Sequence, residues 1–262
     1  SHFEAFKKIK NTKTVAIVET NKKKRLFVKR KFPNINLYRN LDDLLSIEHN
    51  IDIFSICSPT NSHFEILKKL IKKNAKIIIC EKPICSSISQ AKEIYNLSKN
   101  RKGIIVVNHQ RRFEQNFLLA KKIIKKNVIG NIKFINACYT RKVYNIGTHL
   151  IDIIRMLVSS EISHTSSFLV EKKLKNDPSL SGLVFFKNKV CCSIQSLGYK
   201  FKYIFEIEVF GTKGKIKISD NGKKIELFQF SKSKNFTNYF ELKKVKIRDR
   251  LNIKISNDPM KE

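Results

Sequence analysis

The first hundred residues alternate between short apolar runs and longer amphipathic segments, and this alternation constrains the fold more than any other feature of the chain. The runs are almost continuously apolar, which is typical of parallel strands buried on both faces. The segments at 62–73 and 89–99 carry apolar side chains on one helix face. The alternation predicts a parallel sheet with helices on its faces. The predicted strands are 14–19, 51–57, 75–80 and 103–107.

The pattern changes after Asn108. Predicted helices at 117–126 and 149–158 flank a long strand at 132–141, and further β-rich stretches follow, with Asp220, Asn221 and Gly222 as a hairpin turn. This order predicts an α+β domain with a large, mainly antiparallel sheet. We therefore expect an α/β protein with domains at 1–108 and 109–262. The later β-rich stretches are 166–171, 183–186, 190–197, 201–210, 215–218 and 224–230.

Composition excludes several classes of protein. The 262 residues are 42% hydrophobic, enough for a core, and no apolar run reaches the roughly 18–20 residues that span a bilayer. The formal net charge is +31, but the lysines are spread over nearly every predicted helix, so a nucleic-acid partner is not expected. Six cysteines show neither a C-x-x-C pair nor a histidine spacing suited to zinc. We expect reduced cysteines, no metal site and a cytoplasmic protein that binds no membrane.

Two loops follow predicted strands at the sheet edge where α/β proteins bind ligands. The first is SPTNSH at 58–63, and the second is EKP at 81–83. A lysine fixed at such an edge can donate to a substrate oxygen or take part in proton transfer. Each loop alone also fits a structural turn, with Ser62 as the N-cap of the next helix in the first case.

A third segment is YNIGTHLIDIIRML at 144–157. On a helix, His149, Asp152 and Arg155 form a narrow polar stripe beside an apolar face. Asn145 and Asp152 flank His149 at spacings that can fix its tautomer and orientation. A solvated stripe on an amphipathic helix is the alternative.

The order of these segments resembles one family of oxidoreductases. The chain carries SPTNSH, then EKP, NHQRRF at 108–113, NIGTHLID at 145–152 and FGTKG at 210–214. Over nearly its whole length it resembles the Gfo/Idh/MocA family, the glucose-fructose oxidoreductase and inositol dehydrogenase-like enzymes. The resemblance implies a Rossmann dinucleotide-binding domain, then an α/β domain that binds substrate and supports a homodimer or homotetramer.

The resemblance also implies a reaction and the residues that perform it. The family transfers a hydride between NAD(P) and a secondary hydroxyl of a sugar, nucleotide sugar or cyclitol. By this likeness Lys82 binds the reacting hydroxyl, and His149 is the base in oxidation. The implied cofactor site comprises Ser58, Pro59, Asn61, His63, Glu81 and Lys82, and the implied substrate site comprises Arg112, Tyr144, Asn145 and His149.

Glu19 adds an expectation about the cofactor. It ends the predicted strand at 14–19, where a carboxylate can accept from the adenosine ribose hydroxyls and would repel a 2′-phosphate. NAD is therefore expected over NADP.

Two departures from the family pattern shape the remaining expectations. Asn145 stands where the family has an aspartate, and no G-x-G-x-x-G turn occurs in the chain. We expect a chain that begins after the glycine turn, a second domain that continues beyond NDPMKE in the family, and little activity for the fragment. Two alternatives to a dehydrogenase stay open: a non-catalytic, ligand-sensing member of the fold, and charge-driven nucleic-acid binding.

Overall fold

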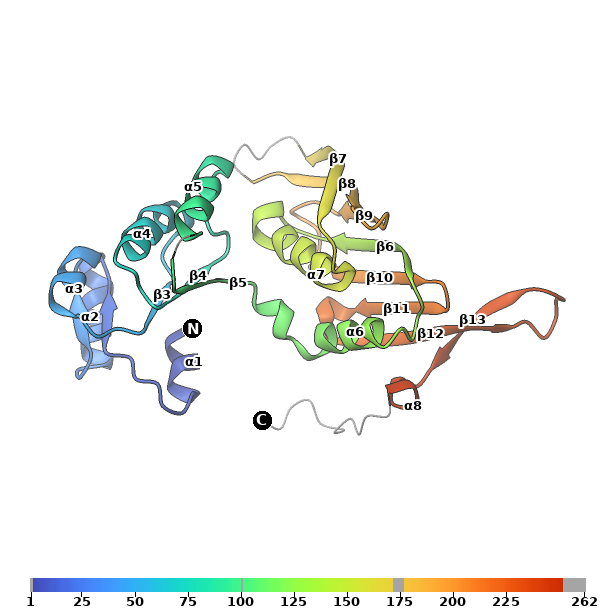
Figure 1. Ribbon diagram of the computed structural model, residues 1–262, viewed down its shortest axis with the longest axis horizontal. Helices are drawn as coiled ribbons and strands as arrows, with labels where there is room; N and C mark the ends of the chain where they lie inside the picture. Colours follow the sequence, from blue (N-terminus) through green and yellow to red (C-terminus); the bar gives the residue numbers. More distant parts are fainter. Residues whose placement is uncertain (1, 100, 172–176, 252–262) are drawn as a thin grey trace. The chain divides into compact units, whose positions relative to one another are not determined.

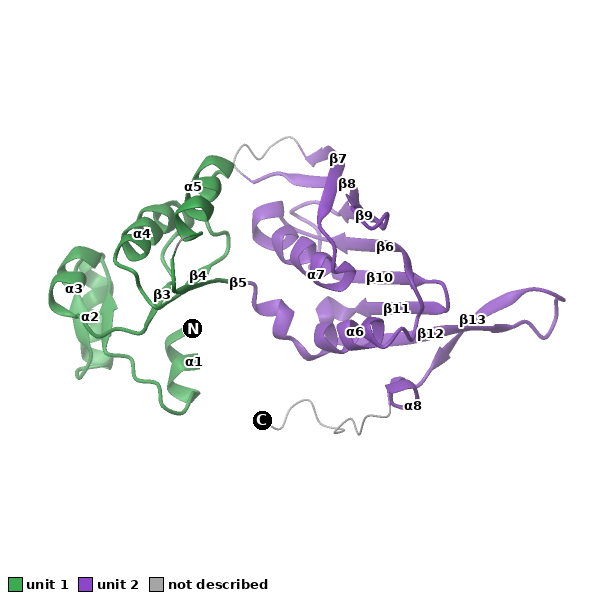
Figure 2. Ribbon diagram, viewed as in Figure 1, with its two compact units in different colours: residues 1–108 green, residues 109–262 purple. Residues whose placement is uncertain are grey.

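The computed structural model describes residues 2–99, 101–171 and 177–251 (Figure 1), so the NDPMKE segment at 257–262 lies outside the described residues. The chain divides into two compact units (Figure 2). Unit 1 is Ser1–Asn108 and unit 2 is His109–Glu262. Each unit is described by itself.

Unit 1 holds five parallel strands in two sheets. β1 (Ala16–Val18) pairs with β2 (Asn36–Tyr38), and β3 (Ile53–Ile56), β4 (Ile77–Glu81) and β5 (Ile104–Asn108) form the second sheet. In the Rossmann strand order 3-2-1-4-5-6, β2 and β1 correspond to places 3 and 2, and β3 to β5 to places 4 to 6. No described strand takes place 1, in agreement with the predicted Rossmann sheet that lacks its first strand.

Helices α4 and α5 of unit 1 pack an apolar core against the second sheet. The helices are α1 (His2–Lys8), α2 (Lys22–Lys31), α3 (Leu41–Ile47), α4 (Thr60–Lys72) and α5 (Ile88–Ser98). The apolar face predicted for α4 is buried, and α5 contributes Ile94. Their core residues, with the strand residues they contact, are Leu67, Leu70, Ile71, Ile94, Ile56, Ile78 and Cys80.

Unit 2 is built on one eight-stranded sheet in the order β13-β12-β11-β10-β6-β9-β8-β7. The β6–β9 pair is parallel and every other pair is antiparallel, which confirms the predicted mainly antiparallel sheet. The strands are β6 (Ile132–Tyr139), β7 (Ile162–Glu171), β8 (Ser179–Phe186), β9 (Cys191–Ser196), β10 (Phe205–Gly211), β11 (Gly214–Ser219), β12 (Lys224–Lys232) and β13 (Phe240–Val245).

One face of this sheet is covered by two helices, α6 (Gln115–Lys125) and α7 (Thr148–Val158) (Figure 1). Burial alternates along β10, where Phe205, Ile207 and Val209 are fully buried and the residues between them are not. Because side chains alternate faces along a strand, this pattern points one face of β10 at the helices. Phe117 of α6 and Leu150 of α7 are fully buried in the same core.

Two local predictions are wrong. Ser62 is not an N-cap, because α4 already begins at Thr60 and the Ser62 hydroxyl donates to the Pro59 carbonyl oxygen from inside the first turn. The strand predicted at 201–210 begins only at Phe205. The Ile204 carbonyl oxygen still accepts from the backbone N–H of Thr140, but the Ile204 N–H donates to the Thr140 hydroxyl instead of a backbone oxygen, so regular pairing ends here.

Short elements escaped prediction. These are β2, α2, α3, β13, the helix α8 (Ile247–Leu251) and the single-turn helices η1 (Gln110–Phe113) and η2 (Val143–Gly147). The elements of three to seven residues show too few periods for their apolar pattern to be read. α2 has ten residues, but its apolar side chains form one run of three among lysines and arginines and show no helical period.

Candidate functional site

Polar side chains gather at the carboxyl edge of the β3-β4-β5 sheet. Glu81 ends β4 and lies opposite Asn108, which ends β5. Lys82 follows Glu81 directly, and the Ser58 loop follows β3. Because the carboxyl ends of parallel strands meet at one edge, the two loops singled out in the sequence belong to the same edge of unit 1.

Both oxygens of the Glu81 carboxylate have donors. Oε1 lies 2.7 Å from Nδ2 of Asn108 and 2.7 Å from Nε2 of His2, and Oε2 lies 3.3 Å from the backbone nitrogen of Lys82. Burial by itself raises the pKa of Glu81, but the hydrogen bonds from Asn108 and His2 outweigh it and leave the pKa below its usual value. The carboxylate is therefore ionised at neutral pH.

His63 holds the other side of the Lys82 turn. Its side chain is buried, with Nδ1 2.8 Å from the Pro83 carbonyl oxygen and Nε2 2.8 Å from that of Ser58. Both neighbours only accept hydrogen bonds, so a neutral imidazole satisfies one of them at a time. His63 ties the SPTNSH loop to the EKP loop; the peptide bond between Lys82 and Pro83 is cis.

Glu19 follows β1 at the edge of the other parallel sheet. Its Oε1 accepts from the backbone N–H of Asn21 at 2.8 Å. Nη1 of Arg25 donates to the carbonyl oxygens of Glu19 and Thr20, at 2.8 and 3.0 Å. Arg25 is thereby held on backbone carbonyl oxygens rather than on the Glu19 carboxylate.

His149 lies in the first turn of α7 in unit 2, and its side chain is almost fully buried. The His109 ring meets it edge to face, with 5.8 Å between ring centroids and 89° between ring planes. The sequence pattern contained His109 inside NHQRRF but gave it no role. What could have pointed to His109 is its place three residues before Arg112, which the resemblance assigned to the substrate site.

Arg112 is turned toward α7. Its Nε lies 2.6 Å from Oδ2 of Asp152, whose side chain is only 12% exposed. Arg112 also lines a shallow cavity of about 340 Å³ together with Arg155 and Met156, which are in the second half of α7. The structure thus pairs Asp152, predicted to flank His149, with Arg112.

Tyr144 and Asn145 lie before α7 rather than on it. The helix predicted at 149–158 is α7, which begins at Thr148, and the preceding turn η2 is π-helical. A wider turn changes which residues share a face, so the four-residue spacing from Asn145 to His149 does not have α-helical geometry. The Tyr144 ring is half exposed, and its N–H donates to Oδ1 of Asp177 at 2.8 Å.

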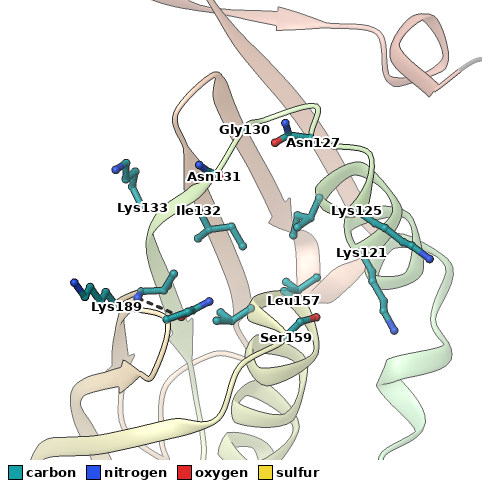
Figure 3. Close-up of a pocket in the computed structure, with 14 residues that line it drawn as sticks. Lys121, Lys125, Asn127, Gly130, Asn131, Ile132, Lys133, Leu157, Ser159 and Lys189 are labelled. Carbon is teal, nitrogen blue, oxygen red and sulfur yellow. Dashed lines mark hydrogen bonds between the residues drawn. The ribbon is translucent and has the colours of Figure 1, made fainter.

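The larger cavity of unit 2, about 890 Å³, lies away from His149 (Figure 3). It is lined by the end of α6, the start of β6 and the last turn of α7, whereas His149 is in the first turn. In Figure 3, Lys133 and Lys189 extend on one side of Ile132, and Lys121 and Lys125 on the other. The lysines do not converge on one point.

Within residues 2–99, 101–171 and 177–251, no group of three His, Cys, Asp or Glu side chains is arranged to hold a metal ion. No helix in the part of the chain that the structure describes is long and apolar enough to cross a membrane.

The polar residues at the strand ends of unit 1 fit part of a dinucleotide. Glu19 suits ribose hydroxyls, and the two loops after β3 and β4 suit the ribose and nicotinamide half. The pyrophosphate normally lies on the N–H groups of a glycine-rich turn, and unit 1 contains a single glycine, Gly103, before β5. The described residues of unit 1 therefore fit the two ends of a dinucleotide but include no glycine-rich turn for its pyrophosphate.

Comparison with known proteins indicates an NAD-binding fold for unit 1. Residues 1–109 match the Gfo/Idh/MocA family model, described as an oxidoreductase family with an NAD-binding Rossmann fold. An uncharacterised oxidoreductase of Schizosaccharomyces pombe is 31% identical over 162 residues, 55% of this chain and 44% of the relative. Myo-inositol 2-dehydrogenase of Thermotoga maritima is 24% identical over 241 residues, 84% of this chain and 71% of the relative. The chain spans less than half the length of the first four curated relatives it matches.

Solved structures share the fold. Levoglucosan dehydrogenase in complex with NADH superposes with a TM-score of 0.75 at 20% identity, covering 88% of this chain and 70% of that one. A super-repressor mutant of Gal80p from Saccharomyces cerevisiae superposes with a TM-score of 0.76 at 20% identity, covering 94% and 75%.

The fold and the matched residues define a protein with a Rossmann unit of the NAD-binding class and an α+β second unit. Residues 1–109 match the Gfo/Idh/MocA family of oxidoreductases, the family that the motif order resembles.

Proposed function

We propose that the protein carrying this chain is an NAD-dependent dehydrogenase that oxidises a secondary hydroxyl of a sugar, nucleotide sugar or cyclitol, or reduces the corresponding ketone. The observation that carries the proposal is Lys82, held between two anchored residues at the carboxyl edge of a parallel sheet in a unit that matches an NAD-binding family. The named relatives, an inositol dehydrogenase and a levoglucosan dehydrogenase, support polyhydroxylated rings as the substrate class.

The chemistry assigns different tasks to Lys82 and His149. NAD, when bound, accepts the hydride from the carbinol carbon. Oxidation also requires the hydroxyl proton to leave, and a neutral imidazole is suited to take it near neutral pH. The Lys82 ammonium donates a hydrogen bond to the same oxygen and stabilises the negative charge that develops there. In the reverse direction the His149 imidazolium returns the proton.

The remaining roles complete the proposed site. Ser58, Pro59, Asn61 and His63 form the loop on the cofactor side, and Glu19 binds the adenosine ribose. The carboxylate at Glu19, with Arg25 held on backbone carbonyls, supports NAD over NADP. Arg112, Tyr144 and Asn145 are proposed to face substrate from unit 2. A homodimer or homotetramer in the cytoplasm completes the proposal, supported by the family likeness and by six cysteines that are all free.

The test is reduced-cofactor formation at 340 nm by the whole protein on a panel of inositols, sugars and nucleotide sugars. Lys82→Ala and His149→Ala are expected to lower kcat by about 100-fold or more, because each removes a group that acts in the transition state. Lys76→Ala is the matched control, since its ammonium lies on Asp52 in an exposed pair. Unchanged turnover in both site variants would refute the catalytic assignment.

A second function has its own supporting observation. Gal80p, named as a repressor mutant, shares the fold, and Asn145 replaces the family's carboxylate before the histidine. A ligand-sensing protein would bind NAD and a sugar without forming NADH. Calorimetric binding together with no absorbance change at 340 nm across the panel would favour it, and any turnover would exclude it.

A further inference from the structure

A histidine at the start of α1 reaches the edge of the β3-β4-β5 sheet. The Nδ1 atom of His2 lies 2.6 Å from Oγ of Ser55 in β3, and its Nε2 lies 2.7 Å from Oε1 of Glu81 at the end of β4. Asn108, at the end of β5, donates to the same Glu81 oxygen. One imidazole thus links α1 directly to two strands and, through Glu81, to a third.

A single neutral tautomer satisfies this arrangement. With the proton on Nε2, His2 donates to the Glu81 carboxylate, while Nδ1 accepts from the Ser55 hydroxyl. The side chains of His2 and Glu81 are 21% and 29% exposed, so the pair is mostly shielded from solvent. A shielded, charge-assisted hydrogen bond holds its geometry better than an exposed one.

Glu81 has little acceptor capacity left for a ligand. Its Oε1 accepts from His2 and Asn108, and its Oε2 faces the backbone N–H of Lys82. A carboxylate engaged on both oxygens by its own chain is suited to holding a turn rather than binding a ribose. The sequence assigned Glu81 to the cofactor, whereas the hydrogen bonds point to another task.

Lys82 lies between two such anchors. On one side Glu81 is held by His2 and Asn108, and on the other the Pro83 carbonyl oxygen lies 2.8 Å from Nδ1 of the buried His63. Residues before and after Lys82 are therefore fixed independently. The direction in which the Lys82 side chain leaves the sheet edge depends on both.

We propose that Glu81 is a positioning residue, held by His2, that orients Lys82 rather than contacting the cofactor. This inference rests on the proposed function for the role of Lys82, but its geometry can be tested without turnover. It makes His2 a functional residue, although it lies in neither loop of the site.

The first test observes Lys82 directly. Reductive ¹³C-methylation of the full chain gives a signal for each lysine, and Lys82→Arg identifies the signal of Lys82. His2→Phe keeps an aromatic ring but removes both polar contacts, and it is expected to shift and broaden the Lys82 signal. His49→Phe, at an exposed histidine of the same unit, is the matched control and should leave that signal in place. A Lys82 signal unchanged in His2→Phe and in Glu81→Ala would overturn the proposal.

The second test separates positioning from cofactor contact. In the whole protein, His2→Phe and Glu81→Ala are expected to lower kcat by about 10- to 100-fold, because small misplacements of a catalytic group cost that much. Affinity for NADH, measured by fluorescence titration, should stay within about twofold. Glu81→Gln keeps the acceptor for Asn108 and His2 and should restore part of kcat. A tenfold loss of NADH affinity in Glu81→Gln would instead make Glu81 a cofactor ligand and refute the proposal.

The two proposals fail in different ways. If the wild-type protein turns over no substrate, the proposed function fails, while the Lys82 signal in His2→Phe still decides the positioning role. If His2→Phe unfolds unit 1, Asn108→Ala removes the other donor to Glu81 and gives a second variant with the same expected shift of the Lys82 signal.

Discussion

Replacing Asn108 with aspartate probes the contact between β4 and β5 with an almost isosteric change. The amide nitrogen of Asn108 lies 2.7 Å from Oε1 of Glu81, so Asn108→Asp puts two carboxylates in direct contact. Two like charges about 3 Å apart repel by roughly 5 kcal/mol at an effective dielectric constant of about 20. A hydrogen bond from the Nε2–H of His2, which lies 3.1 Å from the Asn108 amide nitrogen, offsets part of this repulsion. We expect Asn108→Asp to be about 2–4 kcal/mol less stable than Asn108→Ala at about pH 8.

The penalty should depend on pH in a defined direction. Two carboxylates in contact share a proton, which raises one pKa of the pair and makes the protonated form dominant as the pH falls. At about pH 5 the shared proton restores a hydrogen bond, and the difference between Asn108→Asp and Asn108→Ala should fall to roughly zero. In the wild type the trend is opposite: the lowered pKa of Glu81 contributes stability above its unfolded-state pKa, and that contribution is lost as the pH falls through the lower folded-state pKa.

The assay is amide hydrogen exchange followed by mass spectrometry on peptides that cover β4 and β5. Exchange reports the free energy of opening of these strands separately from unit 2. Asn108→Asp, Asn108→Ala and the wild type are compared at both pH values. An Asn108→Asp penalty of the same size at both pH values would show that the two side chains do not meet, and the network around Lys82 would be refuted.

Three further measurements test the packing inside each unit. Arg112→Ala leaves the shielded Asp152 carboxylate without its partner and should lower the free energy of unfolding in urea by about 1–3 kcal/mol. Arg155→Ala breaks the exposed pair with Glu161 and should cost at most about 1 kcal/mol, so equal losses in the two variants would contradict the assigned pairing. Burial raises the pKa of both Cys80 and Cys192 to about 12, so only about one thiol in ten thousand is ionised at about pH 8. Iodoacetamide should therefore label these two cysteines only in unfolded protein, and rapid labelling of the native chain would show that they are not buried. The Tyr139 hydroxyl accepts from the Leu180 N–H at 3.2 Å and donates to the Leu180 carbonyl oxygen at 2.8 Å. Tyr139→Phe should therefore lower the free energy of unfolding by about 1–3 kcal/mol in a denaturant titration, and an unchanged midpoint would mean that water replaces the hydroxyl.

The sequence predicted the fold class because its signals were long and strongly periodic. The apolar run at 51–57 and the helix at 149–158 correspond to β3 and to α7 within a few residues. Elements of three to seven residues, such as β2 and α3, carry too few periods to be recognised. The π-helical turn before α7 was missed because an α-helix and a wider turn share nearly the same apolar pattern over five residues.

The sequence predicted the parts of the candidate site that lie within one loop or one helix, but not the contacts between them. EKP and SPTNSH lie at strand ends in the sequence, so their shared edge follows from parallel pairing. The contacts of His2 with Glu81 and of His109 with His149 join residues whose partners local periodicity does not specify. Tertiary pairing of this kind depends on register between strands and helices, which a single sequence leaves undetermined.

The proposed dehydrogenase moves a hydride with Lys82 and His149 as the acting side chains. The most direct measurement is mass spectrometry of the cofactor after incubation of the whole protein with NAD and a panel of inositols and sugars deuterated at carbon. The account predicts NADH that carries one deuterium with the wild type, and about 100-fold less of it with Lys82→Ala or His149→Ala. Binding of NAD and ligand with no deuterium in the cofactor would contradict it and leave the ligand-sensing function.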